Sequence, residues 1–288
     1  MWILEQIGEA IKNFLIEVVK GNLTGMFTDV NEKVGTIAGE VGQTPAGWNG
    51  DIFSMIEHIS DTVIVPIAGL IITYVLVYEL ISMVMEKNNM ADVDTFMFFK
   101  FVFKAAVAII LVSNTFTIVS AIFDVGQHVV NASASVIHSD AAIDIAGVLN
   151  SMQEGLEAMS IGELLLLVLE TFIVGLAMNV ITVCITIVIY GRMIEIYLYT
   201  SMAPIPFATF TNREWGQIGN NYLRGLLALA FQGLLIMICV GVYAVLVNTL
   251  TVTEDIHASI WMIAAYTILL CFTLFKTAGL SKSVFNAH

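Results

Sequence analysis

The chain has 288 residues, of which 58% are hydrophobic and only 12% are charged. Its mean hydropathy is +0.88, whereas soluble globular domains carry roughly 25% charged residues. This composition excludes a soluble domain and predicts an all-α, polytopic transmembrane protein. The formal net charge of −13 excludes a broadly basic surface for nucleic acid, because such binding depends on contacts of Lys and Arg with phosphates.

The N-terminal segment, residues 2–19, has the pattern of an amphipathic helix. Its apolar residues recur at helical spacing, while Glu5, Glu9 and other charged residues face the opposite way. Trp2 and the mixed charges of the polar face favour a helix lying in the membrane interface. A helix docked on protein has the same pattern, so that alternative stays open.

The next segment, residues 21–61, is richer in Gly and polar residues. This composition predicts turns and short helical pieces. We therefore expect residues 1–61 to form an extracytoplasmic N-terminal region and residues 62–288 to form the transmembrane domain.

Five apolar segments follow, and each is long enough to cross a hydrocarbon core of roughly 30 Å. The predicted spans are residues 62–85, 101–123, 164–190, 223–250 and 258–280. Pro66 falls in the first turn of the first span, where proline is tolerated because its missing N–H would have no partner within the helix. Between the spans lie a predicted outer loop at residues 124–163 and a predicted cytoplasmic segment at residues 191–222.

The apolar stretch 193–210 is interrupted by Glu195, Pro204 and Pro206. The letters APIPF cannot form a regular helix interior, because proline lacks the N–H and restricts the residue before it. We expect a broken, interfacial or re-entrant segment here. A sixth complete span is the less favoured alternative.

The basic residues predict the orientation, because cytoplasmic loops are enriched in Lys and Arg. Eight of the eleven fall on one side of a five-span topology: Lys87, Lys100, Lys104, Arg192, Arg213, Arg224, Lys276 and Lys282. The loop at residues 124–163 contains no Lys or Arg. We therefore expect the N-terminus outside and the C-terminus in the cytoplasm.

Three ionisable residues fall inside predicted spans: Glu79, Lys104 and Glu170. A charge at mid-membrane costs roughly 2.5 to 3.5 kcal/mol on insertion scales, so these side chains need partners or water. An ion path is one interpretation. We favour the alternative that Glu79 lies near its helix end and that Lys104 snorkels to the interface.

Span three also has a polar face, because its small and hydroxyl residues recur every three or four positions. These residues are Thr171, Gly175, Asn179, Thr182 and Thr186. Such faces usually mark close helix packing in lipid, with pore lining as the alternative, and an oligomer would allow both.

The sequence offers no support for an enzyme, a cofactor site or a metal site. It has no HExxH, GxSxG or P-loop motif. The five histidines are scattered along the chain: His58, His128, His138, His257 and His288. Those in the outer loops are expected to be solvated loop residues and not metal ligands.

The stretch that begins at Gly191 reads GRMIEIYLYTSMAPIPFATFTNREWGQIGNNYLRGLLALAFQG. Its broken APIPF segment, its Asn-Arg-Glu-Trp turn and the helix that follows resemble the TrbL-type channel subunit of conjugative type IV secretion systems. The predicted layout is similar to that family as well. The resemblance assigns Pro204, Pro206 and Trp215 to a structural turn at the cytoplasmic mouth, and it assigns no catalytic residue.

The resemblance implies a subunit of the cell (inner) membrane that forms a homo-oligomeric ring among membrane lipids. Its implied partners are a bitopic scaffold subunit and an assembly ATPase. It would help single-stranded DNA and a relaxase to pass through the membrane. Two alternatives remain: an ion-coupled small-solute transporter, which would show broken helices at mid-membrane, and a non-conducting structural scaffold.

Overall fold

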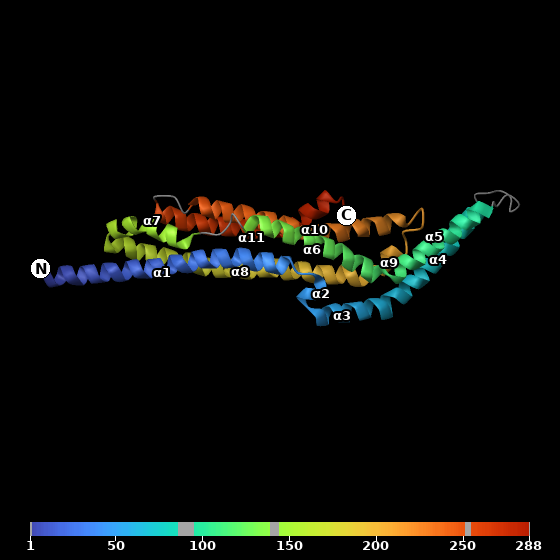
Figure 1. Cartoon of the computed structure of the whole chain (residues 1–288), viewed down its shortest axis with the longest axis horizontal. Coiled ribbons are helices and arrows are strands. Elements are labelled where there is room, and N and C mark those ends of the chain that lie inside the picture. Colours follow the sequence, from blue (N-terminus) through green and yellow to red (C-terminus); the bar gives the residue numbers. More distant parts are fainter. Residues whose placement is uncertain (1, 86–94, 139–143, 251–254, 288) are drawn as a thin grey trace. The chain divides into compact units, whose positions relative to one another are not determined.

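A computed structural model describes residues 2–85, 95–138, 144–250 and 255–287 (Figure 1). Within these residues the chain forms helices and no strand, which confirms the predicted all-α class. The helices are α1 (Trp2–Val41), α2 (Pro45–Trp48), α3 (Gly50–Ile59), the π-helical turn η1 (Ser60–Ile64), α4 (Val65–Met85), α5 (Thr95–Ser113), α6 (Thr115–His138), α7 (Ile145–Ala158), α8 (Ile161–Met202), α9 (Pro204–Phe207), α10 (Gly216–Leu250) and α11 (Ile256–Val284).

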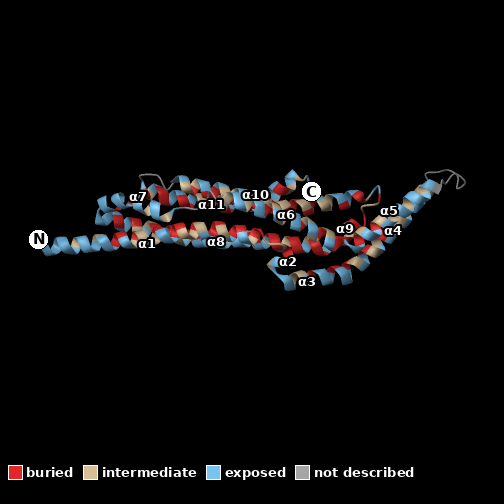
Figure 2. Ribbon diagram, viewed as in Figure 1, coloured by how far each residue is buried: buried red, intermediate tan, exposed pale blue. Residues whose placement is uncertain are grey.

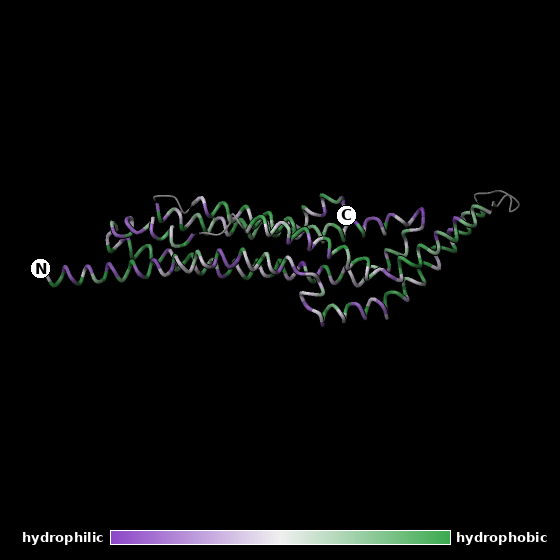
Figure 3. The backbone as a smooth tube through the Cα atoms, viewed as in Figure 1, coloured by the Kyte–Doolittle hydropathy of each residue, from purple (hydrophilic) through white to green (hydrophobic). Residues whose placement is uncertain are grey.

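Five helices in the described residues are long and apolar enough to cross a membrane, as predicted. They are Gly50–Met85, Phe96–Ser113, Ile161–Met202, Gly216–Thr249 and Ile256–Val284. Figure 3 shows that hydrophobic residues dominate α4 and α5, whose outward side chains therefore suit lipid. Among them, Leu70 is 75% exposed and Phe96 is 73% exposed.

The chain divides into two compact units. Unit 1 comprises Met1–Gly42, Val130–Tyr190 and Leu234–Thr277. Its core joins α1, α7, α8, α10 and α11 through fully buried side chains such as Phe27, Leu156 and Met178.

Unit 2 comprises Gln43–Val129, Gly191–Gly233 and Ala278–His288. One of its cores gathers Met193, Phe207 and Leu226, and another packs Ile72 of α4 against Val112 of α5. The expected boundary between residues 61 and 62 falls inside this unit.

Helix α1 is longer than predicted. The turns expected after Gly21 are absent from the described residues up to Val41, because Leu23, Phe27 and Val30 continue a buried stripe at helical spacing. Figure 2 shows the change along α1 from an exposed N-terminal part to a part with one buried face. The second part is docked on this chain's own helices, and the interfacial interpretation of residues 2–19 stays a prediction.

The first span begins earlier than residue 62, because α3, η1 and α4 form one continuous stretch. Pro66 therefore lies inside a long helix and not in its first turn, which corrects the prediction. The π-helical turn explains how the helix continues, since the Val65 N–H bonds to the Ser60 carbonyl five residues earlier. Such a wider turn relieves the crowding that proline causes in an α-helix.

The second predicted span, residues 101–123, contains a helix boundary. Helix α5 ends at Ser113 and α6 begins at Thr115, so the membrane-capable part is Phe96–Ser113. The boundary falls at the polar Ser-Asn-Thr run, where the Asn114 side chain donates to the Ile110 carbonyl at 2.9 Å in addition to the backbone N–H. The predicted outer loop, residues 124–163, is largely helical in α6 and α7, and residues 139–143 lie outside the described residues.

Candidate functional site

The break predicted in the stretch 193–210 occurs only at its end. Helix α8 continues regularly to Met202, so residues 193–202 are part of a span-length helix, which corrects that part of the expectation. Pro204 then begins the short helix α9, and Pro206 lies inside it. Both prolines occupy a helix of four residues, where the missing N–H groups cost little.

The turn between α9 and α10 is held by Asn212, which is buried. Its Oδ1 atom accepts hydrogen bonds from the backbone N–H groups of Glu214 at 2.8 Å and Trp215 at 2.9 Å. Gly219 on α10 packs directly on this turn, because an added Cβ would lie 2.8 Å from the Pro206 carbonyl oxygen. The Asn-Arg-Glu-Trp sequence thus folds as a capped turn.

Trp215 joins this turn to α4. Its ring stacks on Tyr74, with centroids 5.5 Å apart, and on Tyr78, with centroids 5.8 Å apart. The Tyr78 hydroxyl also donates to the Glu214 carboxylate at 3.0 Å. The two tyrosines are spaced by four residues, a helical spacing that could have identified them as a pair.

Glu79 and Lys104 form an ion pair between α4 and α5, with 2.7 Å between Nζ and Oε1. The side chain of Glu79 is only 14% exposed, and that of Lys104 is 35% exposed. From the sequence, Glu79 was expected to lie near its helix end and Lys104 to extend its ammonium to the membrane interface. The structure brings the two side chains together, so their opposite charges compensate each other within the pair of helices α4 and α5, which we call the α4–α5 hairpin.

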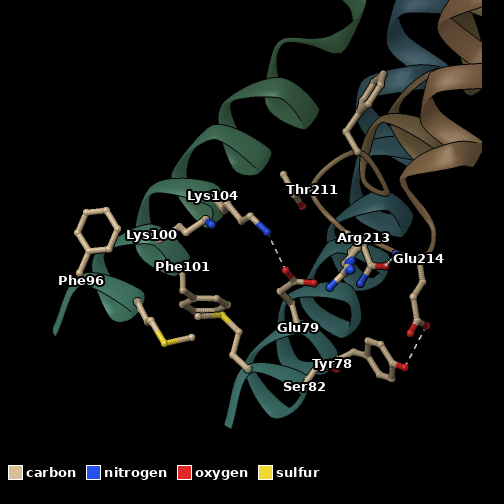
Figure 4. Close-up of a pocket in the computed structure, with 14 residues that line it drawn as sticks. Tyr78, Glu79, Ser82, Phe96, Lys100, Phe101, Lys104, Thr211, Arg213 and Glu214 are labelled. Carbon is tan, nitrogen blue, oxygen red and sulfur yellow. Dashed lines mark hydrogen bonds and ion pairs between the residues drawn. The ribbon is translucent and has the colours of Figure 1, made fainter. Parts of the chain in front are cut away.

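A polar cavity of about 860 Å³ surrounds this ion pair, and we name it the hairpin pocket (Figure 4). Figure 4 shows Lys104 pointing from α5 toward Glu79, with Tyr78 and Glu214 paired beside them. The lining residues are Tyr78, Glu79, Ser82 and Met83 from α4, Phe96, Met97, Lys100, Phe101 and Lys104 from α5, and Phe210, Thr211, Asn212, Arg213 and Glu214 from the turn.

Helices α1 and α8 run side by side within unit 1 (Figure 1). The predicted polar face of α8 lies on the side of α1. The Asn22 amide of α1 donates to the Thr171 hydroxyl at 2.9 Å. The hydroxyls of Thr182 and Thr186 bond back to carbonyls of their own helix one turn earlier, which satisfies them without a partner helix.

Two cavities follow the line where α1 meets α8, and both are lined by Asp29 and Asn179. Together we name them the α1–α8 groove. Their volumes are about 290 and 240 Å³. They bring together all five predicted residues of the α8 face, Thr171, Gly175, Asn179, Thr182 and Thr186, with the α1 residues Asn22, Asp29, Glu32, Lys33, Thr36 and Glu40.

Lys33 is the buried cation of this groove, with a residue exposure of 9%. Its ammonium donates to the Met178 carbonyl at 3.4 Å. Helix α1 is not one of the five membrane-capable helices. Burial lowers the pKa of Lys33, and the nearby Asp29 carboxylate raises it.

Glu170, the third predicted intramembrane charge, does not line the groove. Its carboxylate lies 2.6 Å from Nδ1 of His257 on α11. His257 was expected to be a solvated loop residue, but it begins a helix and is half-buried. The side chain of His138 and the whole of His288 lie outside the described residues.

Sequence reasoning did not recognise Arg192 as a buried residue. Its Nη2 atom donates to the Leu229 carbonyl at 3.5 Å, while Nε and Nη1 have no hydrogen-bond partner in the described part of the chain. The residue is 6% exposed. Its position beside a span predicts only its side of the membrane, so no sequence signal could have indicated this burial.

The chain matches the family described as "TrbL/VirB6 plasmid conjugal transfer like protein" over residues 30–204. The matched region contains α4, α5, all of α8 and most of the α1 part of the groove, and it ends at Pro204. No curated protein and no solved structure matches the chain.

The match covers more than half of the 288 residues, and it confirms the resemblance first seen in the stretch after Gly191. The family is a structural component of transfer systems and is not known as an enzyme family. With its five membrane-capable helices, the chain belongs to the TrbL/VirB6 plasmid conjugal transfer family and is a multi-pass component of the inner membrane.

Proposed function

We propose that this protein is a channel or scaffold subunit of a conjugative type IV secretion system and helps single-stranded DNA and its relaxase through the membrane. Copies of the chain form a ring in the membrane. A bitopic scaffold subunit and an assembly ATPase complete the machine, and the ATPase supplies the energy. The family membership supports the transfer system, and the α1–α8 groove is the observation that carries the role as a conduit.

The groove places a polar surface beside one of the most apolar helices of the chain. Val180 of α8 is 65% exposed and suits lipid, whereas Asn179 faces the charged side of α1. Carboxylates such as Asp29 and Glu32 are costly beside a hydrocarbon-spanning helix unless partners or water reach them. A ring in which these faces point inward would supply that water.

The charge of the groove also suits a passage that does not hold its cargo. Three carboxylates and one lysine line the 240 Å³ cavity of the groove: Asp29, Glu32, Glu40 and Lys33. Such a surface repels phosphates, so a strand would be confined and would not bind. A basic lining would slow transfer by binding the DNA.

Cysteine accessibility tests the hydrated groove. In a variant whose native Cys184, Cys239 and Cys271 are replaced by serine, Asn179→Cys and Thr186→Cys should react with a membrane-impermeant thiol reagent in intact membranes. Reaction should also reduce plasmid transfer, because the adduct narrows the passage. Val180→Cys is the matched control, since it lies about 100° around the helix on the lipid side, and it should not react.

Equal reactivity of the Asn179 and Val180 positions would contradict a hydrated groove. Mass measurement in lipid nanodiscs then separates the remaining readings. A defined ring of several copies agrees with the conduit. A monomer or dimer with an unreactive groove instead agrees with a non-conducting scaffold, whose polar face serves helix packing only.

A further inference from the structure

Among the described residues that line the hairpin pocket, more side chains are positive than negative. Lys100, Lys104 and Arg213 line it together with Glu79 and Glu214, in a chain whose net charge is −13. Lys100 and Lys104 are one turn apart on α5, so both project from the same side of this helix.

Both carboxylates of the pocket are already engaged. Glu79 accepts from Lys104 at 2.7 Å, and Glu214 accepts from the Tyr78 hydroxyl at 3.0 Å. Lys100 is exposed and has no ion pair or hydrogen bond among the described residues. An anion that enters the pocket would therefore meet a lysine that has no counter-charge among the described residues, and Arg213 lines the same pocket.

The wall of the pocket next to these cations is apolar and continues onto the surface of α5. Phe96 lines the pocket and is 73% exposed, and Phe99 and Phe103 are 69% and 70% exposed along the same helix. Helix α5 is membrane-capable from Phe96 onward. A phenylalanine surface of this kind suits acyl chains, whereas a small water-soluble anion gains nothing from it.

We propose that the hairpin pocket binds an anionic phospholipid, with the headgroup phosphate on Lys100 and Arg213 and the acyl chains along the phenylalanines of α5. Basic residues at a membrane surface attract such lipids, and the guanidinium of arginine suits bidentate contact with phosphate. The inference goes beyond the transfer function and does not depend on it. The bound lipid would fix the hairpin at the depth of the headgroups.

Native mass spectrometry of the full chain in a neutral detergent tests this site. Phosphatidylglycerol and phosphatidylcholine with identical acyl chains are added separately, and the retained lipid is counted. We expect preferential retention of phosphatidylglycerol. Replacing Lys100 and Arg213 together by Gln should weaken that retention roughly tenfold and leave phosphatidylcholine unchanged.

Two further variants keep this test decisive. Lys100→Gln alone removes a side chain that has no partner among the described residues, so it should fold normally and still lose part of the preference. Lys276→Gln removes an exposed lysine that does not line the pocket, and it should retain phosphatidylglycerol like the parent chain. Equal retention of the two lipids, or an equal loss in the Lys276 variant, would overturn the site.

Competition identifies the source of the bound phosphate. Glycerol phosphate and a single-stranded oligonucleotide are added at excess to the phosphatidylglycerol complex. Neither should displace the lipid, because neither contacts the phenylalanine surface. Displacement by glycerol phosphate would show a site for free anions, and displacement by the oligonucleotide would show a site for nucleic acid; either result overturns the lipid assignment.

Discussion

Trp215 is the residue that connects the turn after α9 with α4. Its ring is nearly parallel to both tyrosines, with interplanar angles of 14° to Tyr74 and 11° to Tyr78. Offset stacking of aromatic rings contributes roughly 0.5 to 1.5 kcal/mol per pair beyond the buried area. Two such pairs therefore help to hold a turn that is also fixed by the hydrogen bonds of Asn212 and by the bond from Tyr78 to Glu214.

Trp215→Ala should lower the free energy of unfolding by about 2 kcal/mol, because both stacked pairs are lost. Trp215→Phe should retain part of this energy, since a smaller ring can still stack. The measurement is thermal unfolding of the purified chain in detergent. Trp261→Ala is the control, because Trp261 is 49% exposed, and an equal loss in both alanine variants would contradict the role of the stack.

The sequence could not predict which side chains of different helices pair with one another. The polar spacing of α8 predicts one polar face, and all five of its residues line the groove. The family resemblance identifies Trp215 but not the tyrosines on which it stacks. Glu79 and Lys104 lie 25 residues apart on different helices, and Asn22 and Thr171 lie 149 residues apart. Such pairs depend on how helices pack, and helical periodicity reports only which face of each helix is polar.

At the scale of elements, the contact of α10 with α9 depends on Gly219. An added Cβ would lie 2.8 Å from the Pro206 carbonyl oxygen and 3.1 Å from the Phe210 ring. The neighbouring atoms belong to backbone and to a packed ring, so they cannot simply move away. This close approach is what allows α10 to begin directly beside the two prolines.

Gly219→Ala should therefore destabilise the chain by about 1 to 3 kcal/mol. Gly175→Ala is the matched control in α8, because its added Cβ meets no atom within 4 Å. The control should be neutral or slightly stabilising, since alanine favours a helix by roughly 1 kcal/mol over glycine. Melting temperatures in detergent compare the two, and similar losses would contradict a steric origin.

The elements were predicted well in number and type but less well in their bounds. The five membrane-capable helices follow from long apolar runs, which need no tertiary information. The continuation of α1 beyond Gly21 was missed because glycines and polar residues suggested turns, although Leu23, Phe27 and Val30 already carried the helical period. Packing against α8 outweighs the low helix propensity of those glycines.

At the scale of the whole molecule, the distribution of basic residues predicts the orientation in the membrane. Gln153 of α7 belongs to the outer region that lacks Lys and Arg, and Gln217 at the start of α10 follows the basic turn. In a chain without its native cysteines, Gln153→Cys should react with an impermeant reagent on intact cells. Gln217→Cys should react only after permeabilisation.

Both glutamines are exposed, so differences in reactivity report the side of the membrane and not burial. Lys12→Cys is a further check, because the Lys12 ammonium contacts the Glu157 carbonyl of α7 at 2.6 Å. It should react on the same side as Gln153. The reverse pattern would overturn the orientation but leave the helix assignments and the family membership intact.

Helix α1 extends beyond the core on which it packs. Forty residues make a rod of about 60 Å, which is roughly twice the thickness of the hydrocarbon core. Its second half is clamped by buried contacts that begin at Leu15, whereas Trp2 and Leu4 are 69% and 74% exposed. The exposed end from Trp2 to the first buried contact at Leu15 is about 20 Å long, so a tilt of about 10° at Leu15 would move Trp2 by about 3 Å.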